Sequence, residues 1–162
     1  MTIDIRVPGT LFAAISAMPS PSIRIREFNY PQDYEQTARL WRDMDKGVRF
    51  SRSDVPAEIE KKIARDPDLF LVADLDGEII GVVIGGFDGR RGMVYHLAVA
   101  RPHRRNRVAD ALMRELERRL AAKGCIRAYL LVHKDNREAR ALYEKQNWIH
   151  LDEDAVYAKD IA

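Results

Sequence analysis

One stretch near the middle of the chain constrains the fold most, because a strand pattern, a basic loop and a helix pattern follow one another directly. Residues 94–99 are rich in β-branched and aromatic side chains, which is typical of a strand. Residues 110–122 carry apolar side chains on one face at helical spacing, and Gly124 follows where a helix is expected to end. The loop between them, residues 100–109, contains four arginines. Because the start of a helix presents unpaired N–H groups and the positive end of its dipole, the sequence predicts a site here for a ligand that carries phosphates.

The residues at this junction resemble the signature of the GNAT superfamily of acyl-CoA N-acyltransferases. That signature is a strand ending in Leu-x-Val, followed by Arg/Gln-x-x-Gly-x-Gly/Ala and a helix. Residues 97–99 match the end of the strand, Arg104 matches the first loop position and Ala109 the last. Arg107 stands where the family has its central glycine. The resemblance covers residues 23–161, and it is strongest to a small bacterial branch of the superfamily.

A second stretch, residues 136–148, resembles another sequence motif of the family, Asn-x-x-Ala-x-x-Leu-Tyr-x-x-x-Gly-Phe. Asn136 and Tyr143 match, whereas Asn147 replaces the glycine and Trp148 replaces the phenylalanine. After glycine, asparagine best tolerates the left-handed backbone of a helix end, so the first replacement is physically mild. The two motifs together are specific, whereas either one alone is only moderately so.

The resemblance implies an N-acetyltransferase in which a primary amine attacks acetyl-CoA directly in a ternary complex, with no metal. In the family, two parallel strands splay apart at this place, and the pantetheine arm pairs with the exposed backbone. The cofactor-binding residues implied by the resemblance are Leu97, Ala98, Val99, Arg104, Arg105, Asn106, Arg107, Val108, Ala109, Asn136 and Tyr143. Tyr143 is also the expected general acid, since a phenol of pKa ~10 can protonate a thiolate whose thiol has a pKa of ~8.5. The alternative is that Tyr143 only packs in the core.

The general base is harder to assign. The strand positions at which many relatives carry a glutamate hold Met93, Tyr95, His96 and Leu131. His96 is our candidate catalytic base, because a histidine side chain accepts a proton near neutral pH. Alternation along the strand predicts that Tyr95 and His96 point to opposite faces of the sheet. A structural role for His96, a water chain, or an acceptor that arrives already neutral are the open alternatives.

Arg107 leaves two outcomes open. Its side chain swings out and contacts a cofactor phosphate, or it fills the pocket and weakens or abolishes cofactor binding. The second outcome corresponds to an alternative function, a cofactor-impaired sensor or partner-binding module on the same fold. A third interpretation is a nucleic-acid binder that uses the loop arginines as a phosphate patch. The net charge of only +2 disfavours nucleic acid as a partner.

The patterns along the rest of the chain predict an α/β (α+β) fold, with a mostly antiparallel central sheet of six to seven strands and four helices. Strands are expected at 23–28, 69–73, 78–87, 94–99 and 126–133, with a closing hairpin formed by 148–151 and 156–158. Helices are expected at 31–45, 54–66, 110–122 and 136–146. Asp54 is expected to cap the second of these helices. The strand–helix–strand crossover predicts that the strand at 126–133 lies parallel to the one at 94–99.

By analogy with the family, the acceptor pocket involves the first two helices. Several side chains gather there: Trp41, Arg42, Arg49, Phe50 and Arg52. The arginines either hold a carboxylate or phosphate of the acceptor or form a solvated basic face. The acceptor itself, a small-molecule or protein amine, is not identified by the sequence, and a homodimer is left open.

A chain of 162 residues fits one domain, which we expect over residues 23–162, preceded by an N-terminal extension at 1–22. Residues 11–17 hint at a signal peptide, but Asp4 precedes them and the positive start is missing, so a retained extension is expected. No apolar run approaches the ~20 residues of a membrane helix, so no membrane partner is expected. The lone Cys125 excludes an internal disulfide, and we expect a cytoplasmic protein.

Overall fold

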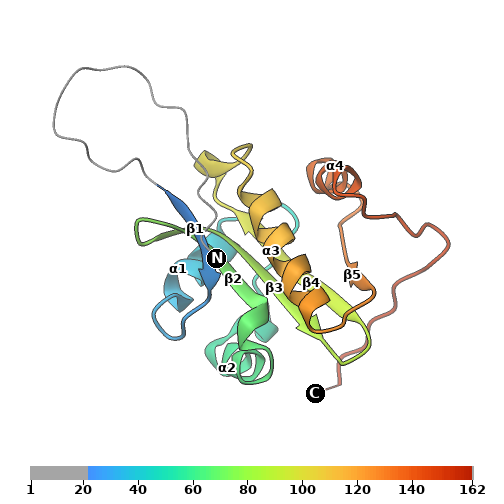
Figure 1. Cartoon of the computed structure of the whole chain (residues 1–162), viewed down its shortest axis with the longest axis horizontal. Coiled ribbons are helices and arrows are strands. Elements are labelled where there is room, and N and C mark those ends of the chain that lie inside the picture. The colour runs from blue at the N-terminus through green and yellow to red at the C-terminus, as the bar shows by residue number, and fades with distance from the viewer. Residues whose placement is uncertain (1–21, 162) are drawn as a thin grey trace. The chain divides into compact units, whose positions relative to one another are not determined.

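The computed structural model describes residues 22–161 and divides the chain into two compact units, residues 1–131 and 132–162. We describe each unit separately (Figure 1). Apart from residue 22, the expected extension and the candidate leader at 11–17 lie outside the described residues. The single domain expected over 23–162 stays a prediction.

The first unit is built on a five-stranded sheet. Its strands are β1 (Ile23–Glu27), β2 (Phe70–Leu75), β3 (Glu78–Phe87), β4 (Gly92–Val99) and β5 (Ala128–Leu130), and they lie side by side in chain order. The first three pairings are antiparallel, and β4 pairs with β5 in parallel. The predicted mostly antiparallel sheet with one parallel crossover is therefore confirmed.

Three α-helices of this unit cover the sheet: α1 (Tyr34–Arg42), α2 (Pro56–Arg65) and α3 (Val108–Ala122). Short 3-10 turns lie beside them: η1 (Arg52–Asp54), η2 (Pro67–Leu69) and η3 (Arg101–His103). Val82 and Ile84 of β3 belong to the apolar core that includes Trp41 of α1. The alternate residue Gly85 faces α3, and a Cβ atom there would lie 2.5 Å from Leu116 Cδ1. Since successive strand residues face opposite sides, α1 and α3 cover opposite faces of the sheet.

The glycines of β3 therefore have a packing role. A Cβ atom at Gly81 would lie only 2.9 Å from Cγ1 of Val108, the first residue of α3. Gly81 and Gly85 let α3 lie directly on the strand, because neither carries a Cβ atom that would collide with the helix. The close packing also fixes where the helix begins, immediately after the basic loop.

Two expectations about the sheet are wrong. The structure has five strands over residues 22–161, not six to seven, because 148–151 and 156–158 form no strands. The apolar side chains of that segment are exposed, Ile149 at 81% and Val156 at 70%, so no buried face holds a hairpin there. The strand expected at 126–133 is shortened to three residues, since its pairing with β4 ends at Val94.

Asp54 also differs from its predicted role. The residue before α2 is Val55, and Pro56 occupies the first turn of the helix, where its missing N–H costs no hydrogen bond. Asp54 instead ends the 3-10 turn η1, where its carboxylate closes a capping box with Ser51. Ser51 contacts only Oδ2 of this carboxylate, so Oδ1 is left for another partner.

The second unit contains one helix, α4 (Arg137–Lys145), within its described residues. Asn136 caps it, because its side-chain oxygen accepts a hydrogen bond from the N–H of Ala139 at 3.1 Å. Asn147 has φ +65°, so it adopts the left-handed conformation at the helix end where the family pattern has glycine. No helix within residues 22–161 is long and apolar enough to span a membrane.

Candidate active site

The sheet opens between β4 and β5. Pairing between them covers only three residue pairs, from Gly92 with Ala128 to Val94 with Leu130. Strand β4 continues for five more residues, Tyr95–Val99, while its other edge stays paired with β3. No pairing with β5 covers the other edge of this segment, where the Val99 carbonyl accepts a hydrogen bond from Nε of Arg104. This opening is what the family resemblance implied for residues 97–99.

A β-bulge lies where the opening begins. Tyr95 pairs with Ile84 and Ala98 pairs with Val82, so His96 and Leu97 together oppose the single residue Val83. His96 has φ +50°, a left-handed conformation that is strained for a residue with a side chain. A bulge bends its strand, so it provides a local cause for the departure of β4 from β5.

The bulge overturns the expected alternation of Tyr95 and His96. The His96 ring contacts Trp41 of α1 in an edge-on arrangement, with the ring centres 5.0 Å apart. Tyr95 lies near Gly86 on the same face of the sheet, beside Lys62 of α2. The extra residue in the bulge interrupts the two-residue period, so both side chains point toward α1 and α2.

His96 has a carboxylate partner that sequence reasoning did not find. Nε2 of His96 lies 2.7 Å from Oδ1 of Asp54, a residue with only 3% of its surface exposed. The other carboxylate oxygen of Asp54, Oδ2, accepts hydrogen bonds from the N–H of Ser51 at 2.7 Å and from the Ser51 hydroxyl at 2.9 Å. The Ser-x-x-Asp spacing of a capping box is a sequence signal for the contacts between Ser51 and Asp54. No sequence signal points to the contact between Asp54 and His96, which lie 42 residues apart.

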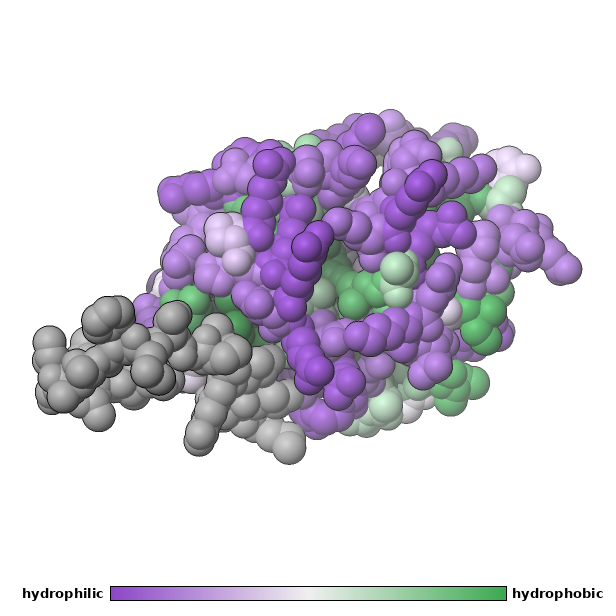
Figure 2. All heavy atoms as spheres, turned by 90° about the horizontal axis from the view of Figure 1, so that it is seen from above, coloured by the Kyte–Doolittle hydropathy of each residue, from purple (hydrophilic) through white to green (hydrophobic). Residues whose placement is uncertain are grey.

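The basic loop keeps the shape of an anion site although its central glycine is missing. Arg105 and Arg107 have φ +65° and +60°, so each adopts a left-handed conformation that glycine would adopt without strain. Arg105, Asn106 and Arg107 are exposed, and Val108 begins α3. Arg107 occupies the cap position without a side-chain cap, so the first N–H groups of α3 remain directed toward the loop. Figure 2, which views the chain from the side of η3 and the start of α3, shows mostly hydrophilic side chains on this face.

Arg104 folds back onto the protein. Its Nε donates to the carbonyl of Val99 at 3.2 Å, and its terminal nitrogen lies 3.3 Å from Asp45 and 3.6 Å from the sulfur of Met44. Asp45 also pairs with Arg101 at 3.5 Å. The side chain of Arg104 thus fastens the loop to the end of β4 and to the segment after α1. The guanidinium group of Arg42 lies over the ring of Phe50 at 4.2 Å.

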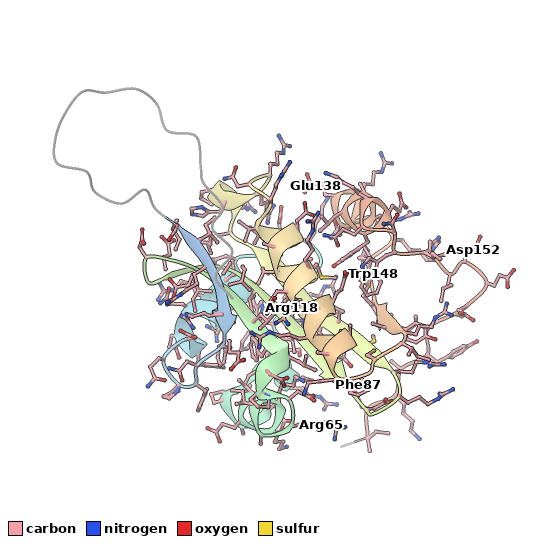
Figure 3. The ribbon with its side chains drawn as sticks, viewed as in Figure 1. Arg65, Phe87, Arg118, Glu138, Trp148 and Asp152 are labelled. Carbon is pink, nitrogen blue, oxygen red and sulfur yellow. The ribbon has the colours of Figure 1, made fainter. Side chains whose placement is uncertain are left out.

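The second unit carries Tyr143 and Asn136. Tyr143 packs against Trp148 with ring centres 6.1 Å apart, and the N–H of Trp148 bonds to the Tyr143 carbonyl at 2.9 Å. Trp148 is labelled in Figure 3. Burial raises the pKa of Tyr143 to about 12. The hydroxyl is therefore protonated at any pH near neutrality. It is also a weaker acid than an ordinary phenol.

Within the first unit, the structure brings together the bulge at His96, the open edge of residues 97–99 and the loop of residues 104–109. Asn136 and Tyr143 belong to the second unit, and their part in the same site stays a prediction. Among the described residues, no cluster of three or more His, Cys, Asp or Glu side chains has the arrangement of a metal site.

An open edge of β4 beside an arginine-rich helix start is the arrangement that the resemblance to acyltransferases of the GNAT type implied. The sequence pattern of the Acetyltransferase (GNAT) family matches residues 34–148, and the chain belongs to that family. A curated acetyltransferase of Pectobacterium atrosepticum is 41% identical over 120 residues, which is 74% of this chain and 84% of the relative.

Solved structures agree with the fold. Ard1 from Thermoplasma volcanium superposes with a TM-score of 0.69 at 25% identity, covering 78% of this chain and 82% of that one. The PaiA N-acetyltransferase from Thermoplasma acidophilum, solved in complex with coenzyme A, superposes with a TM-score of 0.68 at 22% identity, covering 77% and 88%. The GNAT family and the mixed α/β fold predicted from the sequence are confirmed.

Proposed function

We propose that this protein is an N-acetyltransferase that transfers an acetyl group from acetyl-CoA to a primary amine by direct attack in a ternary complex. The observation that carries the proposal is the loop geometry at Arg107. The residue adopts the left-handed conformation of the missing glycine, with its side chain exposed. The loop therefore keeps its shape and the start of α3 stays open to a pyrophosphate.

In the proposed complex, the pyrophosphate lies at the loop of residues 104–109, and the pantetheine arm runs along the open edge of residues 97–99. The exposed guanidinium groups of Arg105 and Arg107 supply charge-assisted hydrogen bonds to phosphate oxygens. Arg104 contributes differently, since its side chain holds the loop against Val99 and Asp45. From the family resemblance alone, Asn136 and Tyr143 are proposed as further cofactor-binding residues.

The reaction requires two proton movements. An alkyl ammonium acceptor first loses a proton, for which His96 is the proposed base. The amine nitrogen then bonds to the thioester carbon, the carbon–sulfur bond breaks, and the thiolate of coenzyme A leaves. The nitrogen then loses a second proton, and the thiolate takes up one proton. The products are therefore the amide, the free thiol and one proton released to solvent.

Tyr143 is the proposed donor to the leaving thiolate. Its raised pKa, about 12, lies well above the ~8.5 of a thiol, so full transfer from the phenol alone is uphill. We infer that Tyr143 mainly donates a hydrogen bond to the developing thiolate. The proton that finally resides on sulfur then comes from the amine nitrogen as the intermediate collapses.

The alternative function, a cofactor-impaired sensor or partner-binding module, predicts that Arg107 blocks the pocket. Its exposed side chain favours retained binding instead. The location in the cytoplasm, the acceptor's identity as a small molecule or a protein, and a homodimer stay proposals.

Calorimetric titration with acetyl-CoA tests the proposal. We expect micromolar binding by the native chain, followed by release of free thiol when a panel of primary amines is added. Tyr143→Phe serves as the control for the chemical step. No binding by the native chain, together with binding by Arg107→Gly, would reverse the assignment in favour of the impaired module.

A further inference from the structure

The contact between Asp54 and His96 fixes more than the position of the imidazole ring. Both oxygens of the Asp54 carboxylate have partners: Oδ2 accepts from the backbone and hydroxyl of Ser51, and Oδ1 faces Nε2 of His96 at 2.7 Å. An ionised carboxylate only accepts hydrogen bonds, so Nε2 must carry the hydrogen. In a neutral imidazole, the lone pair able to accept a proton is then on Nδ1.

We propose that Asp54 is a positioning residue that holds His96 in the Nε2–H tautomer, so that Nδ1 is the atom that accepts the proton of the acceptor amine. The inference rests on the proposed function and deepens it by naming the basic atom and the residue that selects it. Within residues 22–161, no protein group forms a hydrogen bond with Nδ1, and 24% of the His96 side-chain surface is exposed.

The surroundings hold this pair rigidly. The Tyr34 hydroxyl donates to the backbone carbonyl of Asp54 at 3.0 Å, and Asp54 is almost fully buried. Trp41 packs edge-on against the imidazole, and the bulge fixes the backbone of His96. The ring is thus clamped by η1, α1 and β4, and it lies at the start of the open edge where the thioester is proposed to bind.

The same contacts predict what happens when the charge is removed by Asp54→Asn. The backbone N–H of Ser51 still needs an acceptor, so the amide oxygen of the new side chain stays on that side. Its NH₂ group then faces His96 and donates to Nε2. The proton of the neutral ring must move to Nδ1, and the basic lone pair is turned away from the acceptor.

The tautomer can be read without any enzyme assay. Long-range ¹H–¹⁵N correlation spectra of the full chain, recorded where histidine is neutral, distinguish the two forms by their ¹⁵N shifts. The chain has four histidines, and comparison with His96→Gln assigns the signal. We expect the Nε2–H form in the native chain and in Ser51→Ala, which weakens the capping box but leaves Oδ1 in place, and the Nδ1–H form in Asp54→Asn.

Turnover then tests the role of the lone pair. With the amine that gives the fastest thiol release in the screen, we expect kcat to fall about 10²-fold or more in Asp54→Asn, while the affinity for acetyl-CoA and the KM of the amine change less than threefold. Ser51→Ala should keep kcat within about threefold of native.

The outcomes separate the two proposals. A native His96 with its proton on Nδ1, or an even mixture of tautomers, overturns the positioning role even if Asp54→Asn fails to fold. A switched tautomer with unchanged kcat overturns the role of Nδ1 as base. Failure of the native chain to acetylate any amine refutes the proposed function and the base, whereas the tautomer result still decides what Asp54 does.

Discussion

Replacing Arg107 by glycine should stabilise the fold, although it removes a charged side chain. Arg107 has φ +60°, and a left-handed conformation costs a residue with a Cβ atom about 1–2 kcal/mol. Glycine avoids that cost but adds about 0.5–1 kcal/mol of backbone entropy to the unfolded chain. Because the side chain is exposed, little packing is lost. The midpoints of these two ranges give a net gain of about 0.75 kcal/mol in the free energy of unfolding.

For a chain of this length, that gain corresponds to a rise in Tm of about 1–4 °C. Thermal unfolding followed by circular dichroism measures it. Arg105→Gly should behave alike, since its φ is +65°. Asn106→Gly is the matched control, because Asn106 lies between the two and is outside the left-handed region. The Tm of Asn106→Gly should fall slightly, because glycine raises the entropy of the unfolded chain and relieves no strain in the folded one.

A Tm of Arg107→Gly that falls as far as that of Asn106→Gly would show that the left-handed conformation is not strained or not adopted. The same proteins report on the cofactor. If Arg107 contacts a phosphate, Arg107→Gly should bind acetyl-CoA more weakly despite its greater stability, by about 1.5–3 kcal/mol for a charge-assisted hydrogen bond. Tighter binding would indicate that the native side chain obstructs the site.

Three further changes test other parts of the structure. Tyr143→Phe should lower kcat by a larger factor than it weakens acetyl-CoA binding in calorimetry. The native rate should show no loss from Tyr143 ionisation up to about pH 10, because burial raises its pKa to about 12. Glu115→Gln should destabilise the fold by about 2 kcal/mol at neutral pH in urea unfolding, since hydrogen bonds from Arg118 and Arg119 lower the pKa of Glu115 to about 2. The depressed folded-state pKa means that this stabilisation is present above the ordinary value of 4.5 and is lost as the pH falls toward 2, so the difference between the two proteins should shrink over that interval. Gly85→Ala should cost about 1–3 kcal/mol by crowding Leu116, whereas Gly86→Ala, whose added carbon would meet nothing closer than 3.7 Å, should not show that steric loss; equal losses would contradict the close helix packing.

The elements that the sequence predicted well are those whose signals are local. The bounds expected for β3 match the structure, because a turn at Asp76-Gly77 precedes it and another follows. Residues 76 and 77 adopt the left-handed conformations that such a hairpin turn requires. Helix α3 is similarly marked by its apolar face and by Gly124, whose φ of +82° ends it.

The terminal hairpin shows the limit of such signals. Alternating apolar residues around Ile149 and Val156 have the pattern of strands, but a strand forms only where a neighbour offers backbone groups to pair with. The pattern of a strand therefore predicts the conformation a segment prefers, and not the presence of its partner.

The same distinction explains what sequence reasoning found and missed in the candidate site. The basic loop and the open edge lie within one continuous stretch, so a motif could locate them. Arg107 and Asn147 occupy motif positions where the family has glycine, and both have the positive φ that glycine adopts without strain. The partnership of His96 with Asp54 depends on a bulge that shifts the register of β4 by one residue and on a turn in a different segment. A shift of one residue reverses the face to which a strand side chain points, so the expected alternation placed His96 wrongly relative to Tyr95. Chemistry that depends on register, such as the choice of a basic nitrogen, could therefore be assigned only once the fold was known.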